Sequence, residues 1–137
     1  MDFDLTKEQE MIRKEVRKFA ESEISPVAAD LDETETFSSK LTRAMGEIGL
    51  FGMFVSEDYQ GQGLDYLSYI IAVEEIARID GSQAATIAAG NSLGIGPIYY
   101  FGSEAQKKKI STETLQRRRS LGIRTHRTDC RIRRRRQ

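Results

Sequence analysis

Cysteine and histidine are nearly absent from this chain of 137 residues, which contains one of each, Cys130 and His126. A disulfide needs two cysteines, and a structural zinc site usually needs about four cysteine or histidine ligands. A nucleophilic cysteine needs a histidine base and an orienting partner as well. The composition therefore predicts no disulfide and no metal site, and it argues against cysteine-based catalysis.

Long apolar runs are also missing. The chain has no stretch of about 18 or more apolar residues, so no segment is expected to span a membrane. The first residues, Met1 to Asp4, are acidic where a signal or transit peptide would be basic. A chain of this length with 39% apolar residues is expected to fold as one globular domain in the cytoplasm.

Lysine is missing from the last part of the chain. Residues 1–109 carry 11 basic and 19 acidic side chains, whereas residues 110–137 carry 10 basic and 2 acidic ones, and all of those basic residues are arginines. The last part also lacks aromatic residues and any helical or strand periodicity. We therefore predict a folded domain over 1–109 and a disordered, arginine-rich tail over 110–137.

The tail leaves two functional interpretations open. A dense cationic arm neutralises phosphates, so domain and tail together would form a helical binding module whose arm contacts nucleic acid or an acidic protein. The other interpretation is a tail without function. Because no aromatic side chain is interleaved with the arginines, bases have no stacking platform, and we do not expect nucleic acid as the partner.

Residues 1–109 show the periodicity of helices. Thr6 and Gln9 have the spacing of a capping box ahead of an apolar stripe of about five turns. Ser25 with Pro26 is typical of a helix start, and Gly49 of a helix end. Helices are predicted over about 6–23, 25–31, 38–48, 65–79, 82–92 and 103–109, with a short turn at 98–101.

Two consecutive segments of the predicted domain are not helical. Leu50–Val55 is an apolar run too short for a helix, and it is expected to be a buried connector. The polar, glycine-rich segment Ser56–Gly63 is expected to follow as a surface loop. Its Gln60–Gly63 part is similar to a phosphate-binding loop, but no strand precedes it, so we expect a structural turn.

The helix predicted after Asp65 is the most apolar one. Its apolar residues, which include Leu67 and Ile70, cover more than half of its circumference, so this helix is expected to be central. Adjacent Glu74 and Glu75 point about 100° apart and cannot act as opposed carboxylates, so we expect one to be exposed and the other paired. Residues 1–109 thus show no catalytic, cofactor-binding or metal-binding set, and composition and spacing indicate an all-helical domain.

Four segments together resemble the N-terminal helical domain of acyl-CoA dehydrogenases. They are Gly49–Leu64 (GLFGMFVSEDYQGQGL), Val73–Ala77 (VEEIA), Gly90–Gly94 (GNSLG) and Gly102–Lys109 (GSEAQKKK). Their order and spacing fit over about residues 3–109 and are most similar to the short-chain, butyryl-type branch. The family usually has a proline and a glycine in the loop where this chain has a serine and a glutamine: Ser56 and Gln60.

The resemblance implies an all-α, up-and-down helical bundle as the first of three domains. In the family, a β-barrel and a second helical bundle follow, and a glutamate of that bundle removes the α-proton of an acyl-CoA substrate. FAD takes the hydride, an electron-transfer flavoprotein accepts the electrons, and the protein assembles as a homotetramer. This chain lacks both later domains, so it is expected to be an inactive fragment that has no catalytic residue and does not bind FAD. Side chains that the missing domains would cover are expected to face solvent: Ile95, Ile98 and Phe101.

The resemblance also assigns roles to five residues. Ala89, Gly90 and Leu93 correspond to part of the wall of the acyl pocket, and close helix packing is the alternative role for Ala89 and Gly90. Leu50 and Leu64 match an apolar docking surface for the electron-transfer flavoprotein. Burial in the core is an equal alternative for these two leucines.

The genetic code offers an explanation for the tail. Residues 123–137 can be encoded so that reading one base later, from within the codon of Gly122, yields AFGLTEPTAGSDAGG, a form of the family's flavin-contacting segment. Residues 110–114 likewise yield YLPKL, the family's usual continuation after the lysines. Synonymous codons free only the middle base of each shifted codon, so agreement of this length by chance is improbable. We infer a frameshift, which one extra adenine after the codons of Lys107–Lys109 explains.

Overall fold

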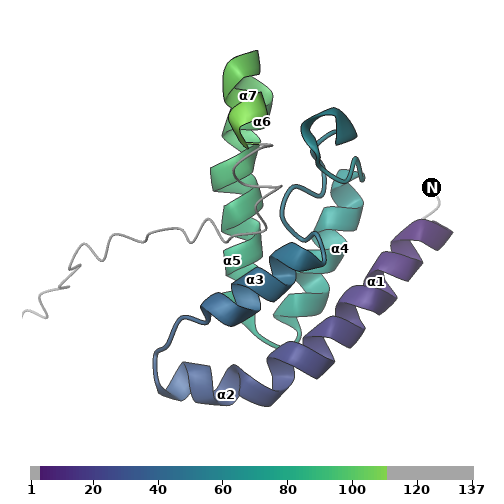
Figure 1. Ribbon diagram of the computed structural model, residues 1–137. Helices are drawn as coiled ribbons and strands as arrows, with labels where there is room; N and C mark the ends of the chain where they lie inside the picture. Colours follow the sequence, from purple (N-terminus) through teal and green to yellow (C-terminus); the bar gives the residue numbers. More distant parts are fainter. Residues whose placement is uncertain (1–3, 111–137) are drawn as a thin grey trace, which may run out of the picture.

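The structure is a computed structural model that describes residues 4–110, and every regular element in this range is helical (Figure 1). The α-helices are α1 (Lys7–Phe19), α2 (Ser25–Glu33), α3 (Ser39–Glu47), α4 (Tyr66–Ala77), α5 (Gly81–Ala89), α6 (Gly96–Phe101) and α7 (Glu104–Ile110). Two π-helical turns, η1 (Ala20–Ile24) and η3 (Gly90–Ile95), and one 3-10 turn, η2 (Glu57–Tyr59), complete this part. The predicted all-α class is confirmed for these residues, whereas the predicted tail, apart from Ile110, lies outside them.

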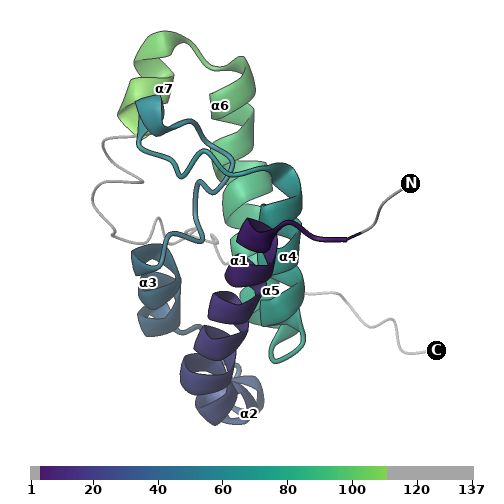
Figure 2. The ribbon, with the colours of Figure 1, turned by 90° about the vertical axis from the view of Figure 1, so that its right-hand side faces the viewer.

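Helix α4 is the centre of the arrangement, because it packs against both α1 and α5. α1 and α4 run in the same direction, since Gln9 bonds to Asp65 at their first turns and Arg17 pairs with Glu75 near their ends. α4 and α5 form an antiparallel pair, and α6 and α7 continue beyond the far end of α5 (Figures 1 and 2). None of the helices in the described part combines the length and apolar character that crossing a bilayer requires.

The chain passes from α1 into α2 without leaving the helical path. The predicted capping box is present, since Thr6 Oγ1 accepts from Gln9 N at 3.2 Å and Gln9 Oε1 accepts from Thr6 N at 3.0 Å. The helix start expected at Ser25 and Pro26 is confirmed, but no side chain caps α2, because η1 leads directly into it. Pro26 lacks the N–H that an uninterrupted α-helix would need, and the helix widens here instead of breaking.

The connector between α3 and the loop forms part of the core. Gly49 ends the α3 region with φ 82°, and Leu50 begins the connector at 3% exposure, as the apolar run predicts. The core cluster takes residues from α1, η1, α3, the connector, α4, α5 and η3: Val16, Ala20, Ile24, Leu41, Met45, Leu50, Met53, Phe54, Val55, Tyr69, Ala72, Ile76, Ala84, Ile87 and Ile95.

Several apolar side chains lie on the surface of the described part. Leu67 and Ile70 belong to the apolar surface of the helix predicted to be central, and each is 49% exposed. Phe101 is 89% exposed and Ile98 is 37% exposed, as expected. Ile95 contradicts that expectation at 4% exposure, because it ends the π-helical turn η3 with its side chain in the core.

Candidate functional site

The junction of α5 and η3 is tied to the connector by one buried amide. The Asn91 side chain is fully buried, and its Nδ2 donates to Leu50 O at 2.8 Å and to Ile87 O at 3.1 Å. Its Oδ1 accepts from Gly52 N at 2.7 Å. One side chain therefore satisfies backbone groups of two segments that are about forty residues apart in sequence, which the residue pattern did not reveal.

The three residues expected to form an acyl-pocket wall lie at this junction. Ala89 and Gly90 are partly exposed, and Leu93 is 77% exposed. Their spacing of three and four residues brings them to one side of the helical path. A Cβ on Gly90 would lie 2.6 Å from Phe51 Cε1, so close packing against the connector, the alternative role, applies to Gly90 in this structure.

We expect Gly90→Ala and Gly94→Ala to change stability in opposite directions. The new methyl at Gly90 meets Phe51 at 2.6 Å and 2.8 Å, whereas the one at Gly94 meets nothing closer than 3.9 Å. Overpacking is expected to lower the free energy of unfolding by about 1–2 kcal/mol for Gly90→Ala. Removing a helical glycine without a clash is expected to raise it by about 0.5–1 kcal/mol for Gly94→Ala.

Urea denaturation of both variants measures these changes. Adding Phe51→Leu to Gly90→Ala is expected to recover part of the loss, because the shorter side chain leaves room for the methyl group. Equal effects of the two glycine substitutions would contradict the close approach.

An apolar pocket lies between α1 and the connector, with a volume of about 420 Å³. Leu50 and Leu64 both line it, together with Met11, Ile12 and Phe19 of α1. Leu50 is 3% exposed and belongs to the core cluster, whereas Leu64 is only partly buried against that cluster. The two leucines thus contribute to the core and also border a recess that is open to the surface.

The glycine-rich loop is held together by its own backbone. Gly61 N donates to Ser56 O at 3.1 Å, and Gly63 N donates to Val55 O at 2.8 Å. Gln62 Nε2 donates to Gly49 O at 2.7 Å, which fastens the loop to the end of α3. Because these N–H groups are already used, they cannot cradle a phosphate, and the loop is the structural turn that was predicted.

The pair Glu74 and Glu75 separates as predicted. Glu74 is exposed, whereas Glu75 is 3% exposed and accepts two hydrogen bonds from Arg17 at 2.8 and 2.9 Å. Arg78 Nη1 lies 3.0 Å from Glu75 Oε2, and Arg13 Nε lies 3.7 Å from its Oε1. The hydrogen bond from Arg17 is the main cause that lowers the pKa of Glu75, and Arg78 lowers it further.

Neither a metal centre nor a catalytic set emerges from this geometry. Between residues 4 and 110 there is no group of three or more acidic, cysteine or histidine side chains placed to hold a metal ion. The buried carboxylate of Glu75 is held by arginines in an ion-pair cluster. It does not line any of the pockets described for residues 4–110, where a catalytic base or nucleophile would have to lie. The site candidates are therefore surfaces of contact, namely the Ala89–Leu93 wall and the apolar pocket.

A family profile described as "Acyl-CoA dehydrogenase, N-terminal domain" matches residues 6–117, which is most of the chain. The chain belongs to the acyl-CoA dehydrogenase family. The enzymes of this family are oxidoreductases, and the resemblance stated from the sequence is confirmed. The boundary expected after Lys109 stays a prediction, since the profile extends slightly beyond it.

Named relatives agree with the family assignment. The chain is 47% identical over 109 residues to the short-chain specific acyl-CoA dehydrogenase of Clostridium acetobutylicum, covering 80% of this chain and 29% of that protein. It is 44% identical over 109 residues to the mitochondrial short-chain specific enzyme of Rattus norvegicus, covering 80% of this chain and 26% of that one. This acyl-CoA dehydrogenase chain therefore spans less than a third of the length of these relatives.

Solved structures agree with the fold. Butyryl-CoA dehydrogenase from Megasphaera elsdenii superposes with a TM-score of 0.76 at 38% identity, covering 81% of this chain and 30% of that chain. A chain from a study of the electron transferring flavoprotein of Acidaminococcus fermentans superposes with a TM-score of 0.78 at 44% identity, covering 80% and 29%. The helical arrangement described above is thus that of the acyl-CoA dehydrogenase N-terminal domain.

Proposed function

We propose that this chain is the N-terminal part of an FAD-dependent acyl-CoA dehydrogenase that introduces a double bond into short-chain acyl-CoA thioesters in the cytoplasm. The family profile over residues 6–117 carries this proposal. Relatives named as short-chain specific support the substrate class. Within the described residues, we propose that Ala89, Gly90 and Leu93 contribute a stretch of the acyl-pocket wall.

The two larger pockets described between residues 4 and 110 do not offer the groups that FAD needs. The pyrophosphate of FAD needs cations or free N–H groups. The pocket between α2 and α5 is instead bordered by the carboxylates of Asp32, Glu35 and Asp80. The apolar pocket beside α1 offers mainly aliphatic side chains. When bound, FAD would supply the hydride acceptor of the family's reaction. We propose that this chain alone is inactive.

The apolar pocket supports a docking role for Leu50 and Leu64. A recess of about 420 Å³ with an apolar lining suits an apolar side chain from a partner. We propose that an electron-transfer flavoprotein inserts such a side chain here when the domain is part of an intact homotetrameric enzyme.

For the tail, we propose a frameshift after Lys109. The nucleotide sequence from Gly102 to about fifty codons beyond Gln137 tests this explanation, because family sequence in the shifted frame is then expected.

A fusion protein tests the proposed function directly. Residues 1–109 of this chain are joined to the remaining part of the Clostridium acetobutylicum relative, and the unaltered chain serves as the control. We expect the fusion to purify yellow and to reduce an artificial acceptor with butyryl-CoA, while the unaltered chain stays colourless and inactive. Flavin bound by the unaltered chain, or a fusion that folds and binds flavin without dehydrogenase activity, would contradict the proposal.

The same fusion tests the pocket wall. Ala89→Leu is expected to lower kcat/KM for butyryl-CoA by about tenfold, because added methylenes reduce the space for the acyl chain. Ala85→Leu on the same helix is the control, since Ala85 is exposed and lies one turn away. An equal effect of both substitutions would show that Ala89 does not line the acyl pocket.

A further inference from the structure

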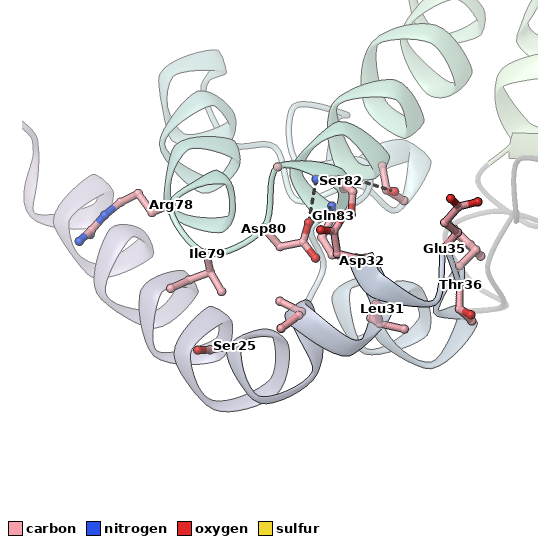
Figure 3. A pocket seen from close by; sticks show the side chains of 15 residues that line it. Ser25, Leu31, Asp32, Glu35, Thr36, Arg78, Ile79, Asp80, Ser82 and Gln83 are labelled. Atoms are coloured by element: carbon pink, nitrogen blue, oxygen red, sulfur yellow. Dashed lines mark hydrogen bonds between the residues drawn. The ribbon is translucent and has the colours of Figure 1, made fainter.

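A pocket of about 830 Å³ lies away from the acyl-pocket wall, between α2 and the first turn of α5 (Figure 3). We call it the acidic pocket. Asp32 comes from α2, Glu35 and Thr36 from the turn after it, and Asp80 and Gln83 from the start of α5. This pocket has no role in the proposed function.

Three carboxylates border the acidic pocket. Asp80 Oδ1 caps α5 by accepting from Ser82 N at 2.8 Å and from Gln83 N at 3.2 Å, so these two N–H groups are not available to an anion. Asp32 and Glu35 add two further carboxylates to the border. Arg78 also borders the pocket, but its Nη1 is held at 3.0 Å by Glu75.

One buried acceptor at this pocket is unsatisfied. The Gln83 residue is 3% exposed, and its Oε1 accepts no hydrogen bond from any described residue. A buried carbonyl oxygen without a donor is unfavourable, so a donor that reaches Gln83 at this wall of the pocket removes that cost. The missing donor and the surrounding carboxylates call for the same kind of ligand, a cation with N–H groups.

The acidic groups of the pocket do not form a metal site with three side-chain ligands. Within residues 4–110 no three acidic side chains are close enough together to hold one. An alkyl chain that ends in a guanidinium or ammonium group can reach several separated acceptors and can lay its methylenes along Ala28, Leu31 and Ile79.

We propose that the acidic pocket binds an alkyl guanidinium or ammonium cation, which donates to Gln83 and pairs with Asp32 and Asp80. Two sources can supply this chemistry. One is an arginine side chain from residues 117–136 of this same chain, which carry all ten arginines of the last segment. The other is a free diamine or polyamine.

Calorimetric titration of the full chain with agmatine, which has a guanidinium at one end and an ammonium at the other, tests the proposal. We expect saturable binding, and we expect Asp32→Asn, Asp80→Asn and Gln83→Met each to weaken it about fivefold. Asp80→Asn keeps the helix cap, because asparagine caps as well as aspartate. Asp30→Asn, which removes the same charge from α2 outside the pocket, is expected to change the affinity less than about twofold.

A second variant distinguishes the two sources. A variant with serine in place of all ten arginines is expected to raise the affinity for agmatine about tenfold if the chain's own arginines occupy the pocket, and to leave it unchanged if the ligand is a free cation. The replaced residues are Arg117–Arg119, Arg124, Arg127, Arg131 and Arg133–Arg136. Both results agree with a cation site in the acidic pocket and differ only in the source of the cation. No saturable heat up to about 20 mM agmatine, equal binding of uncharged N-butylurea, or an equal effect of Asp30→Asn would overturn the proposal.

Discussion

Replacing Asn91 by leucine is expected to lower the free energy of unfolding by about 4 kcal/mol, the largest effect of any single substitution considered for this chain. The leucine side chain is of similar size, so the loss comes mainly from hydrogen bonds. Leu50 O and Gly52 N each lose the partner that they have at 2.8 Å and 2.7 Å, and both lie in a buried segment. Each buried backbone group left without a partner costs about 1–3 kcal/mol.

Ser92→Ala is the matched control for Asn91→Leu. Ser92 is the next residue, it is exposed, and its Oγ donates to Ala88 O at 2.6 Å within the same helical path. Its loss is expected to cost at most about 0.5 kcal/mol. Urea denaturation followed by circular dichroism measures both variants, and a loss below about 1 kcal/mol for Asn91→Leu would show that the amide is dispensable for holding the connector.

Replacing Glu75 by glutamine is expected to destabilise the chain by about 3 kcal/mol at neutral pH. The substitution leaves Arg17 and Arg78, which lie 2.8 Å and 3.0 Å from this carboxylate, without their charged partner between α1 and α4. Breaking a buried ion pair on one side costs about 3–5 kcal/mol, and the partial exposure of the arginines puts the expectation at the low end. Glu74→Gln removes the same charge from the exposed neighbour and is expected to cost less than about 0.5 kcal/mol.

The pH dependence of stability separates the two glutamates as well. The hydrogen bond from Arg17 holds the pKa of Glu75 in the folded chain below its ordinary value of 4.5. The stabilisation is therefore complete above that value, and it is lost as the pH falls through the lower pKa of the folded state. We expect Glu75→Gln to flatten this acid-side loss and Glu74→Gln to leave it unchanged. Parallel curves for all three proteins between about pH 2 and 6 would contradict the ion-pair role.

The starts of the helices could be predicted from local sequence. Thr6, Ser38 and Asp65 each cap a helix through a residue three positions later, so the signal and the structure lie within one turn. The burial of the connector that begins at Leu50 and the turn at Gly63 could also be predicted, because both depend on the residues of one short segment. The family itself followed from motifs that the profile over 6–117 confirms.

The candidate sites could be predicted only in part from the sequence. The wall residues Ala89, Gly90 and Leu93 came from the family resemblance and not from any chemical pattern, and their role stays a proposal. Two features had no such signal. Asn91 reaches a segment 41 residues away at Leu50, and the burial of Gln83 without a donor for its side-chain oxygen is a property of the folded chain.

The sequence by itself determined the helical class, the helix starts and the family of this chain, because these depend on neighbours within a few residues or on motif order. Only the tertiary structure decided which apolar residues are buried: Ile95 lies in the core, whereas Leu67 and Ile70 are 49% exposed. It also decided that Glu75, rather than Glu74, meets Arg17, a partner 58 residues away. Burial and pairing of this kind depend on which helix faces pack together, and a one-dimensional pattern gives the period of a face but not what covers it.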